Sequence, residues 1–301
     1  MRRSSKALLS VGVTAVTLGG GYAWYRWLMR RQVTWQRILA DNIPVHSAYW
    51  RARRELPGDI LYIAIGDSAA QGIGASRPAR SYVGVIAKRL EKLSGRSIRV
   101  INLGISGATL QTALEKELPR FARIKPALVA DAIVTVSIGA NDIAGWDPDR
   151  FAAQLDELFS RLPKHAIVAD LPSFYFLPGE RKAGAGNRIL REAADRHGLR
   201  VVDLHDTMKR QGMRGVATQF AGDLFHPNDR GYDVWADAFM PAVVDRLEQV
   251  LEKLEAGERQ AQGQGRGAGD AAGGSAGGSA DGSAESSPRS QSRASTNTES
   301  A

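Results

Sequence analysis

The chain has 301 residues, a formal net charge of +8 and a pI of about 9.9, and it contains no cysteine. The missing cysteines exclude disulfides, cysteine-ligated metal sites and a cysteine nucleophile. The positive charge suits nucleic acid or an anionic membrane, but much of it lies beside one hydrophobic segment near the N-terminus, and the sequence has no zinc-finger spacing or RNP-like aromatic motif. We therefore expect a membrane surface, and no nucleic acid, as the partner of the basic residues.

Residues 1–31 hold this hydrophobic segment. The run Ala7–Tyr25 carries no charge, and its length is close to the roughly 20 residues that a helix needs to cross a bilayer. Trp24 and Trp27 lie at its end, where aromatic side chains favour the membrane interface. The pattern predicts an uncleaved transmembrane anchor, and the alternative is a cleaved signal peptide. The basic residues on its two flanks are Arg2, Arg3, Lys6, Arg26, Arg30 and Arg31.

Basic residues on both sides leave the orientation of the segment open, because the positive-inside rule needs an excess on one side. With an anchor, we expect the protein at the cell membrane with its main domain outside the cytoplasm; with cleavage, we expect secretion. Residues 32–57 follow as a juxtamembrane connector, predicted to be a helix interrupted at Pro44. Residues 257–301 are rich in Gly, Ser, Ala and Gln, so they have too few large apolar side chains to form a core and are expected to be disordered.

Residues 58–256 are predicted to form one α/β domain, because apolar runs alternate with helical patterns along them. The expected strands are Asp59–Ile65, Ile98–Leu103, Ala132–Ile138, Ala166–Asp170 and Leu199–Val202. The expected helices lie near Ser81–Leu93, Thr109–Phe121, Pro148–Arg161, Arg181–His197 and Asn228–Leu254, the last with a kink at Pro241. Strands without an exposed face, separated by helices, indicate a parallel sheet in a three-layer, doubly wound α/β/α fold.

Polar blocks follow several of these strands. The first strand runs into Gly66–Gly72 (GDSAAQG), the second ends in Asn102–Gly104, and the third ends in Gly139–Asp142 (GAND). A further block, Asp223–Asn228 (DLFHPN), lies near the end of the domain. Ligands of open parallel sheets bind beyond the carboxyl ends of the strands, so these blocks predict an active site there.

The residue types in these blocks suit attack on an ester by an activated hydroxyl group. Ser68 lies at a tight turn between strand and helix and supplies the hydroxyl. His226 is the expected base, and Asp223, three residues earlier, can bind its second ring nitrogen and fix the tautomer. The backbone N–H groups of Ser68 and Gly104 and the side-chain amide of Asn141 are candidate donors to the developing oxyanion.

The four blocks resemble those of the SGNH hydrolases, also called GDSL lipases, esterases or acylhydrolases. The Ser, Gly, Asn and His in the name of that family match Ser68, Gly104, Asn141 and His226, and its D-x-x-H block matches Asp223–His226. The resemblance implies a flavodoxin-like, mainly parallel sheet of about five strands and ester hydrolysis without metal or cofactor. It also supports the donor role of Gly104. One departure is Ala69, where many members carry Leu, and this bears on the substrate more than on the mechanism.

Aromatic residues near the strand ends are candidate substrate-binding residues. The loop at 171–178 reads LPSFYFLP, so Phe174, Tyr175 and Phe176 are predicted either to line an acyl pocket or to pack on the domain. Trp146, which follows the GAND block, has the same two interpretations.

The leading functional prediction is a serine hydrolase that cleaves carboxylic esters, with a small molecule or a lipid as substrate and a monomeric catalytic domain. An acyltransferase or a sugar deacetylase on the same fold is the alternative. A binding module without catalysis is disfavoured, since a binder has no need of a base beside Ser68.

Overall fold

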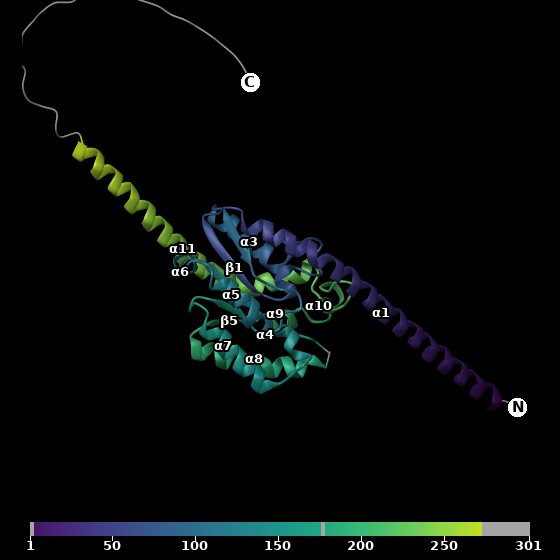
Figure 1. Cartoon of the computed structure of the whole chain (residues 1–301). Helices are drawn as coiled ribbons and strands as arrows, with labels where there is room; N and C mark the ends of the chain where they lie inside the picture. The colour runs from purple at the N-terminus through teal and green to yellow at the C-terminus, as the bar shows by residue number, and fades with distance from the viewer. Residues whose placement is uncertain (1–2, 176–177, 273–301) are drawn as a thin grey trace, which may run out of the picture. The chain divides into compact units, whose positions relative to one another are not determined.

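A five-stranded, all-parallel sheet forms the centre of the protein (Figure 1). The computed structural model describes residues 3–175 and 178–272, and it describes side chains from residue 26 onward, except for residues 28, 29 and those from 261. The strands are β1 (Ile60–Gly66), β2 (Ile98–Asn102), β3 (Ile133–Ser137), β4 (Ile167–Ala169) and β5 (Arg200–Val202). Their order, β2-β1-β3-β4-β5, is that of the flavodoxin-like fold, so the predicted fold class and all five predicted strands are confirmed.

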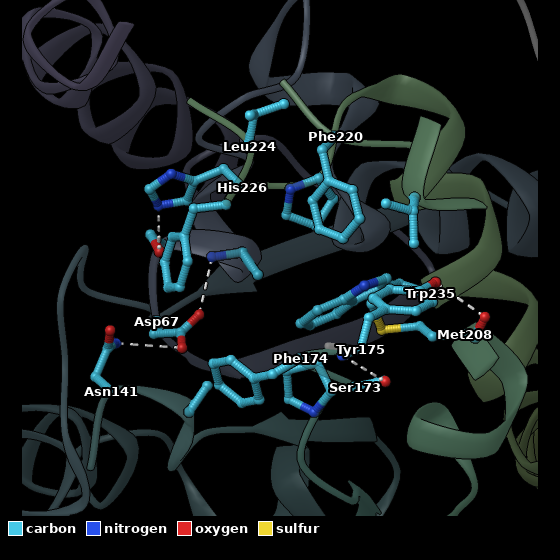
Figure 2. A pocket seen from close by; sticks show the side chains of 17 residues that line it. Asp67, Asn141, Ser173, Phe174, Tyr175, Met208, Phe220, Leu224, His226 and Trp235 are labelled. Atoms are coloured by element: carbon cyan, nitrogen blue, oxygen red, sulfur yellow. Dashed lines mark hydrogen bonds between the residues drawn. The ribbon is translucent and has the colours of Figure 1, made fainter. Parts of the chain in front are cut away.

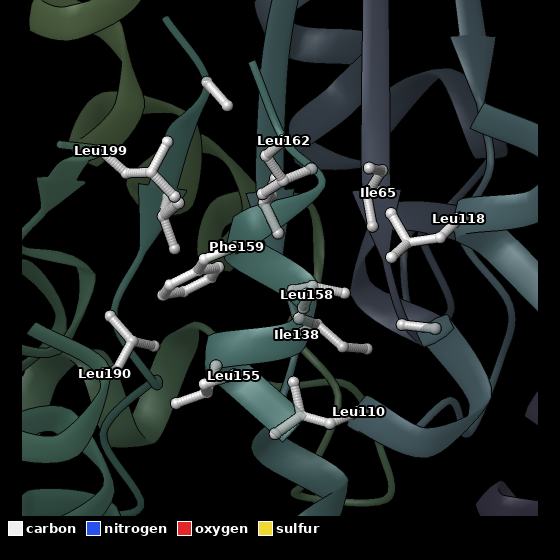
Figure 3. Packing of buried hydrophobic residues seen from close by; sticks show 14 of the residues in the cluster. Ile65, Leu110, Leu118, Ile138, Leu155, Leu158, Phe159, Leu162, Leu190 and Leu199 are labelled. Carbon is white, nitrogen blue, oxygen red and sulfur yellow. The ribbon is translucent and has the colours of Figure 1, made fainter. Parts of the chain in front are cut away.

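Helices cover both faces of the sheet because successive side chains of each strand point to opposite faces. Ile63 and Ile65 of β1 pack into one core with α7 (Pro148–Ser160) and α8 (Gly179–His197), as Figure 3 shows for part of this cluster. Tyr62 of β1 points to the opposite face, where its hydroxyl lies 2.9 Å from the Thr135 hydroxyl of the neighbouring strand β3. Figure 1 shows α7 and α8 on one side of the sheet and α3 (Tyr82–Ser94) on the other.

The second core joins helices from distant parts of the sequence. Tyr82 of α3 stacks on Phe239 of α11 (Asp229–Ala272), with ring centroids 5.4 Å apart. α11 follows the loop at 219–228, so this packing holds that loop beside the end of β1. The shorter helices are α2 (Ser68–Gln71), η1 (Pro78–Arg80), α4 (Leu110–Thr112), the π-helix η2 (Ala113–Glu117), α5 (Leu118–Phe121), α6 (Pro126–Ala130), η3 (Ala140–Ile143), α9 (Leu204–Lys209) and α10 (Gly212–Thr218).

The helix α1 (Arg3–Arg54) covers residues 32–54 of the predicted connector at 32–57. It continues through Pro44, so the predicted interruption there is absent. Because proline has no N–H group, Pro44 cannot donate to the carbonyl of Ala40, four residues earlier in the helix. Both residues are exposed, so water can bond this carbonyl instead. The last turn of α1 lies on the edge strand, where Arg53 donates to the Ile98 carbonyl at 3.0 Å.

Two predictions concern the ends of the chain. In the part of the chain that the structure describes, no helix combines the length and the apolar character needed to cross a membrane; the side chains of residues 1–25, which carry the predicted anchor, lie outside the described residues. At the other end, α11 runs to Ala272, past the predicted start of the disordered tail at residue 257. Residues 251–262 are mostly Glu, Lys, Gln, Ala and Leu, which favour a helix over this first part. Residues 273–301 lie outside the described residues.

The chain divides into two compact units, Met1–Lys253 and Leu254–Ala301. The first unit holds the sheet, and it also includes residues 32–57.

Candidate active site

The turn after β1 presents Ser68 at the start of α2. Asp67 caps this helix, since its Oδ1 accepts the Ala69 N–H at 2.9 Å. Gly66 has to be a glycine, because a side chain there would come within 2.6 Å of the Ser137 carbonyl oxygen on β3. The Gly66 N–H is held by Glu117 Oε2 at 3.0 Å, and burial raises the pKa of Glu117 well above its usual range. Close packing therefore fixes both sides of the turn that carries Ser68.

The loop 219–228 brings an acid and a base to the same place. Asp223 is fully buried, and its Oδ1 accepts the N–H groups of Phe225 and His226, each at 3.1 Å. Its Oδ2 lies 2.6 Å from His226 Nδ1. This tight turn requires a left-handed backbone at Leu224, with φ +56°. Burial alone would raise the pKa of Asp223, but the hydrogen bond and charge of His226 outweigh it and hold that pKa below its usual range.

His226 connects this loop to Ser68. Its Nε2 lies 3.1 Å from Ser68 Oγ. An ionised carboxylate only accepts, so Asp223 fixes the proton on Nδ1 and leaves Nε2 of the neutral ring as an acceptor for the Ser68 hydroxyl. The structure thus brings Ser68 together with Asp223 and His226, although Ser68 and His226 are 158 positions apart in the sequence. This geometry permits proton transfer from the Ser68 hydroxyl to His226.

The remaining predicted donors lie near the same strand ends and have partners there. Asn141 of η3 donates from Nδ2 to the Ala108 carbonyl at 2.8 Å and to Asp67 Oδ2 at 3.4 Å. Burial raises the pKa of Asp67 to about 6. The Gly104 N–H donates to Asn102 Oδ1 at 3.0 Å. Asn141 borders the same cavity as Ser68, whereas the N–H of Gly104 is directed to its own loop.

The predicted supporting role of Asp142 has a direct counterpart. Its Oδ2 accepts the Leu110 N–H at 3.0 Å, which ties η3 to the start of α4. Asp142 thereby fixes the turn on which Asn141, the residue before it, lies.

A cavity of about 240 Å³ opens beside Ser68 and His226. Figure 2 shows Phe174, Tyr175 and Phe220 facing the same space as His226. The apolar residues of its wall are Ala69, Ala140, Pro172, Phe174, Tyr175, Met208, Val216, Phe220, Leu224, Phe225, Pro227 and Trp235. Of the candidate substrate-binding residues, Phe174 and Tyr175 therefore line the cavity, and Phe176 lies outside the described residues. Trp146 packs on Phe151 and is not part of the wall.

Comparison with known proteins identifies the family. Residues 64–234 match the GDSL-like Lipase/Acylhydrolase family. The chain belongs to this family. Accordingly, this GDSL-family protein is a hydrolase that acts on ester bonds. The resemblance inferred from the four sequence blocks is confirmed.

Relatives of this GDSL hydrolase include proteins of known structure. The GDSL-like esterase Rv1075c of Mycobacterium tuberculosis is 28% identical over 276 residues, which is 83% of this chain and 86% of its own. An α/β hydrolase from the metagenome of Lake Arreo has a TM-score of 0.50 and 24% identity, over 62% of this chain and 96% of its own. A variant of an acetyl-xylooligosaccharide esterase from Geobacillus has a TM-score of 0.50 and 22% identity, over 63% of this chain and 96% of its own. These two structures support the fold.

Sequence reasoning missed several residues of the GDSL site. Met208 and Val216 belong to the short helices α9 and α10, which no strong pattern predicted, and Phe220 follows them in the loop. Gln71, inside the recognised GDSAAQG block, also carries contacts that the block itself does not reveal. Among the described residues, no three His, Cys, Asp or Glu side chains gather in a way that would hold a metal ion.

Proposed function

We propose that this GDSL hydrolase cleaves esters that carry an apolar acyl group, with Ser68 as nucleophile, His226 as base and Asp223 as the residue that orients the base. The observation that carries the proposal is the position of Ser68 Oγ, 3.1 Å from His226 Nε2 at the border of a largely apolar cavity. Such a cavity buries an acyl chain, and a few polar groups at its mouth fix the ester.

In the proposed reaction, Ser68 Oγ attacks the ester carbonyl carbon and its proton passes to His226 Nε2. The ionised Asp223 stabilises the resulting imidazolium. The same proton then goes to the departing alcohol, which leaves an acyl group on Ser68. Water next enters, gives one proton to His226 and attacks the acyl carbon, so that the carboxylic acid is released and Ser68 recovers its hydrogen.

The negative charge on the carbonyl oxygen needs donors during both steps. Ser68 N–H lies in the first turn of α2, where N–H groups have no carbonyl partner within the helix. Asn141 Nδ2 is the second proposed donor, since Asn141 borders the cavity beside Ser68. Both of its hydrogens have partners, so it has to exchange the longer bond, to Asp67 Oδ2 at 3.4 Å, for the oxyanion when substrate binds. Gly104 acts as a third donor only if Asn102 Oδ1 releases its N–H when substrate binds.

Acyl chain length tests the proposal directly. For p-nitrophenyl esters from acetate to dodecanoate, kcat/KM is expected to rise with each methylene until the cavity is full and then to fall. Burial of one methylene contributes about 0.8 kcal/mol, or roughly a threefold to fourfold gain per carbon. The measurement is the initial rate of p-nitrophenol release at each chain length.

A cavity variant and a matched control sharpen this test. Val216→Trp fills the pocket from α10, so it should lower activity on hexanoate at least tenfold, by roughly the loss of two buried methylenes or more, and spare acetate. Met213→Trp lies on the same helix but is exposed at 66%, outside the wall, and should change neither substrate. Acetate as the best substrate, with no effect of Val216→Trp, would show that the cavity does not hold the acyl group.

For the N-terminus, we propose that residues 1–31 anchor the enzyme in the cell membrane with the catalytic domain outside the cytoplasm. The support is the length of Ala7–Tyr25, its aromatic end and its basic flanks. An inserted helix should keep the full chain in the membrane fraction through salt and carbonate washing, whereas salt releases a purely electrostatic attachment. A soluble protein with Trp24 as its first residue would instead identify a cleaved signal peptide.

A further inference from the structure

Gln71, the last residue of α2, is held from behind by α1. His46 Nδ1 lies 2.9 Å from the Gln71 carbonyl oxygen, and Trp50 Nε1 donates to the same oxygen at 3.0 Å. Because a carbonyl oxygen only accepts, the first contact places the proton of His46 on Nδ1. Ser47 adds a bond from its hydroxyl to Gln71 Oε1 at 3.3 Å.

The reason for these contacts lies in the shortness of α2. A helix of one turn leaves its last carbonyl groups without partners in the helix, and a buried carbonyl has to find others. Gln71 is only 7% exposed, and His46 and Trp50 are each 4% exposed, so water has little access to this group. The two donors from α1 fill both lone pairs of the Gln71 carbonyl.

The side chain of Gln71 extends the link to the next loop. Its Nε2 donates to the Gly104 carbonyl at 2.8 Å, and its Oε1 accepts the Ser106 hydroxyl at 3.1 Å. The backbone of Gln71 is bonded to the turn that carries Ser68, since its N–H donates to the Asp67 carbonyl at 3.2 Å. One residue thus joins α1, the turn of Ser68 and the loop of Gly104.

The same helix reaches the loop of the acid and the base. A side chain built on Gly222, directly before Asp223, would overlap the Trp35 indole of α1. α1 therefore contacts both the turn that carries Ser68 and the loop that carries Asp223 and His226. It does so although it lies outside residues 64–234, which match the family.

We propose that His46, Ser47 and Trp50 are positioning residues that hold Gln71, and through it Ser68 and the Gly104 loop, in the reactive arrangement. In this proposal, α1 supports the geometry of the active site although it lies outside residues 64–234, which match the family. The proposal rests on the proposed role of Ser68 as nucleophile. It concerns the geometry of attack, so it predicts a change in kcat and in the reactivity of Ser68 more than in KM.

The test uses the full chain in detergent and a double variant, His46→Leu with Trp50→Phe, which removes both donors to Gln71 and keeps much of the buried volume. For p-nitrophenyl butyrate, kcat should fall about 10- to 100-fold, the size of effect expected when a reacting group is misplaced by about 1 Å. KM should stay within about twofold, and the rate constant for fluorophosphonate labelling of Ser68 should fall as much as kcat. If the double variant does not fold, Trp50→Phe alone, with His46 retained, is expected to lower both rates about threefold, as loss of one of two equivalent bonds should.

Arg53→Met is the matched control. Arg53 lies on the same helix and fastens it to the Ile98 carbonyl and Glu91, without a bond to Gln71. Its removal should leave kcat and the labelling rate within about twofold of wild type. Equal losses in Arg53→Met would overturn the proposal in favour of a general need for docked α1, and so would wild-type labelling in the folded variants that lack the donors. Failure of the proposed function is a separate outcome, because wild-type protein would then not be labelled at Ser68 at all.

Discussion

Replacement of Ser68 by alanine is expected to abolish ester hydrolysis and fluorophosphonate labelling while the protein stays folded. Loss of the nucleophile in a serine–histidine–aspartate arrangement costs on the order of 10⁶ in kcat in subtilisin. The fold should tolerate the change, because Asp67 and not the Ser68 hydroxyl caps α2. Single-turnover and steady-state rates, together with a thermal unfolding curve, measure the two parts of this prediction.

Ser160→Ala serves as the control for this variant, since Ser160 is an exposed serine at the end of α7. It should be labelled and active like wild type. A Ser68→Ala protein that keeps a tenth of wild-type activity with an unchanged unfolding curve would show that another group attacks the ester.

Replacement of Asn141 by alanine is expected to lower kcat by about 10² to 10³ with little change in KM. The amide of Asn141 is proposed to bind a charge that exists only in the transition state, so its loss leaves ground-state binding intact. Asn141→Asp removes the donor at nearly constant volume and should lose at least as much, because it also places a carboxylate near the developing charge. A change in KM alone in both variants would make Asn141 a substrate-binding residue instead.

The strands and the motif residues were predictable because their signals are local. The run at Asp59–Ile65 indicated the first strand within one residue of the observed Ile60–Gly66, since a parallel strand buried on both faces is apolar throughout. The spacing of Asp223 and His226 likewise encodes a single turn. Their meeting with Ser68 did not follow from a strand end, since β5 ends at Val202 and α9 and α10 come between it and Asp223. It was implied by the residue types and by the resemblance to the SGNH hydrolases.

The cavity was less predictable because distant loops build it. α10 reads GMRGVAT, and its glycines and threonine are weak helix formers, so packing rather than propensity forms this helix. Phe220 approaches His226 through a short antiparallel bridge to Pro227, for which the sequence has no separate signal. The sequence indicated that the aromatic loop at 171–178 lies near the site. It did not indicate whether the aromatic side chains face the cavity or pack on the domain.

The role of α1 was hidden for a related reason. A helix in the connector was predicted, yet its partner Gln71 is 25 positions beyond His46, and a hydrogen bond at that separation leaves no periodic pattern. The partners of the predicted oxyanion donors were equally out of reach, since Asn102 holds the Gly104 N–H through a side chain that reads only as the end of a strand.

Leu224 illustrates a conflict between folding stability and substrate choice. A residue with a side chain in the left-handed conformation costs roughly 1 kcal/mol, and glycine at that position is free of this cost. Leu224→Gly should thus remove the strain, but glycine also enlarges the conformational freedom of the unfolded chain, which offsets part of the gain. It would also remove one of the apolar side chains that line the cavity, in the segment between Asp223 and His226. Selection of variants for heat resistance alone would therefore favour a change in the cavity that we propose binds the acyl group.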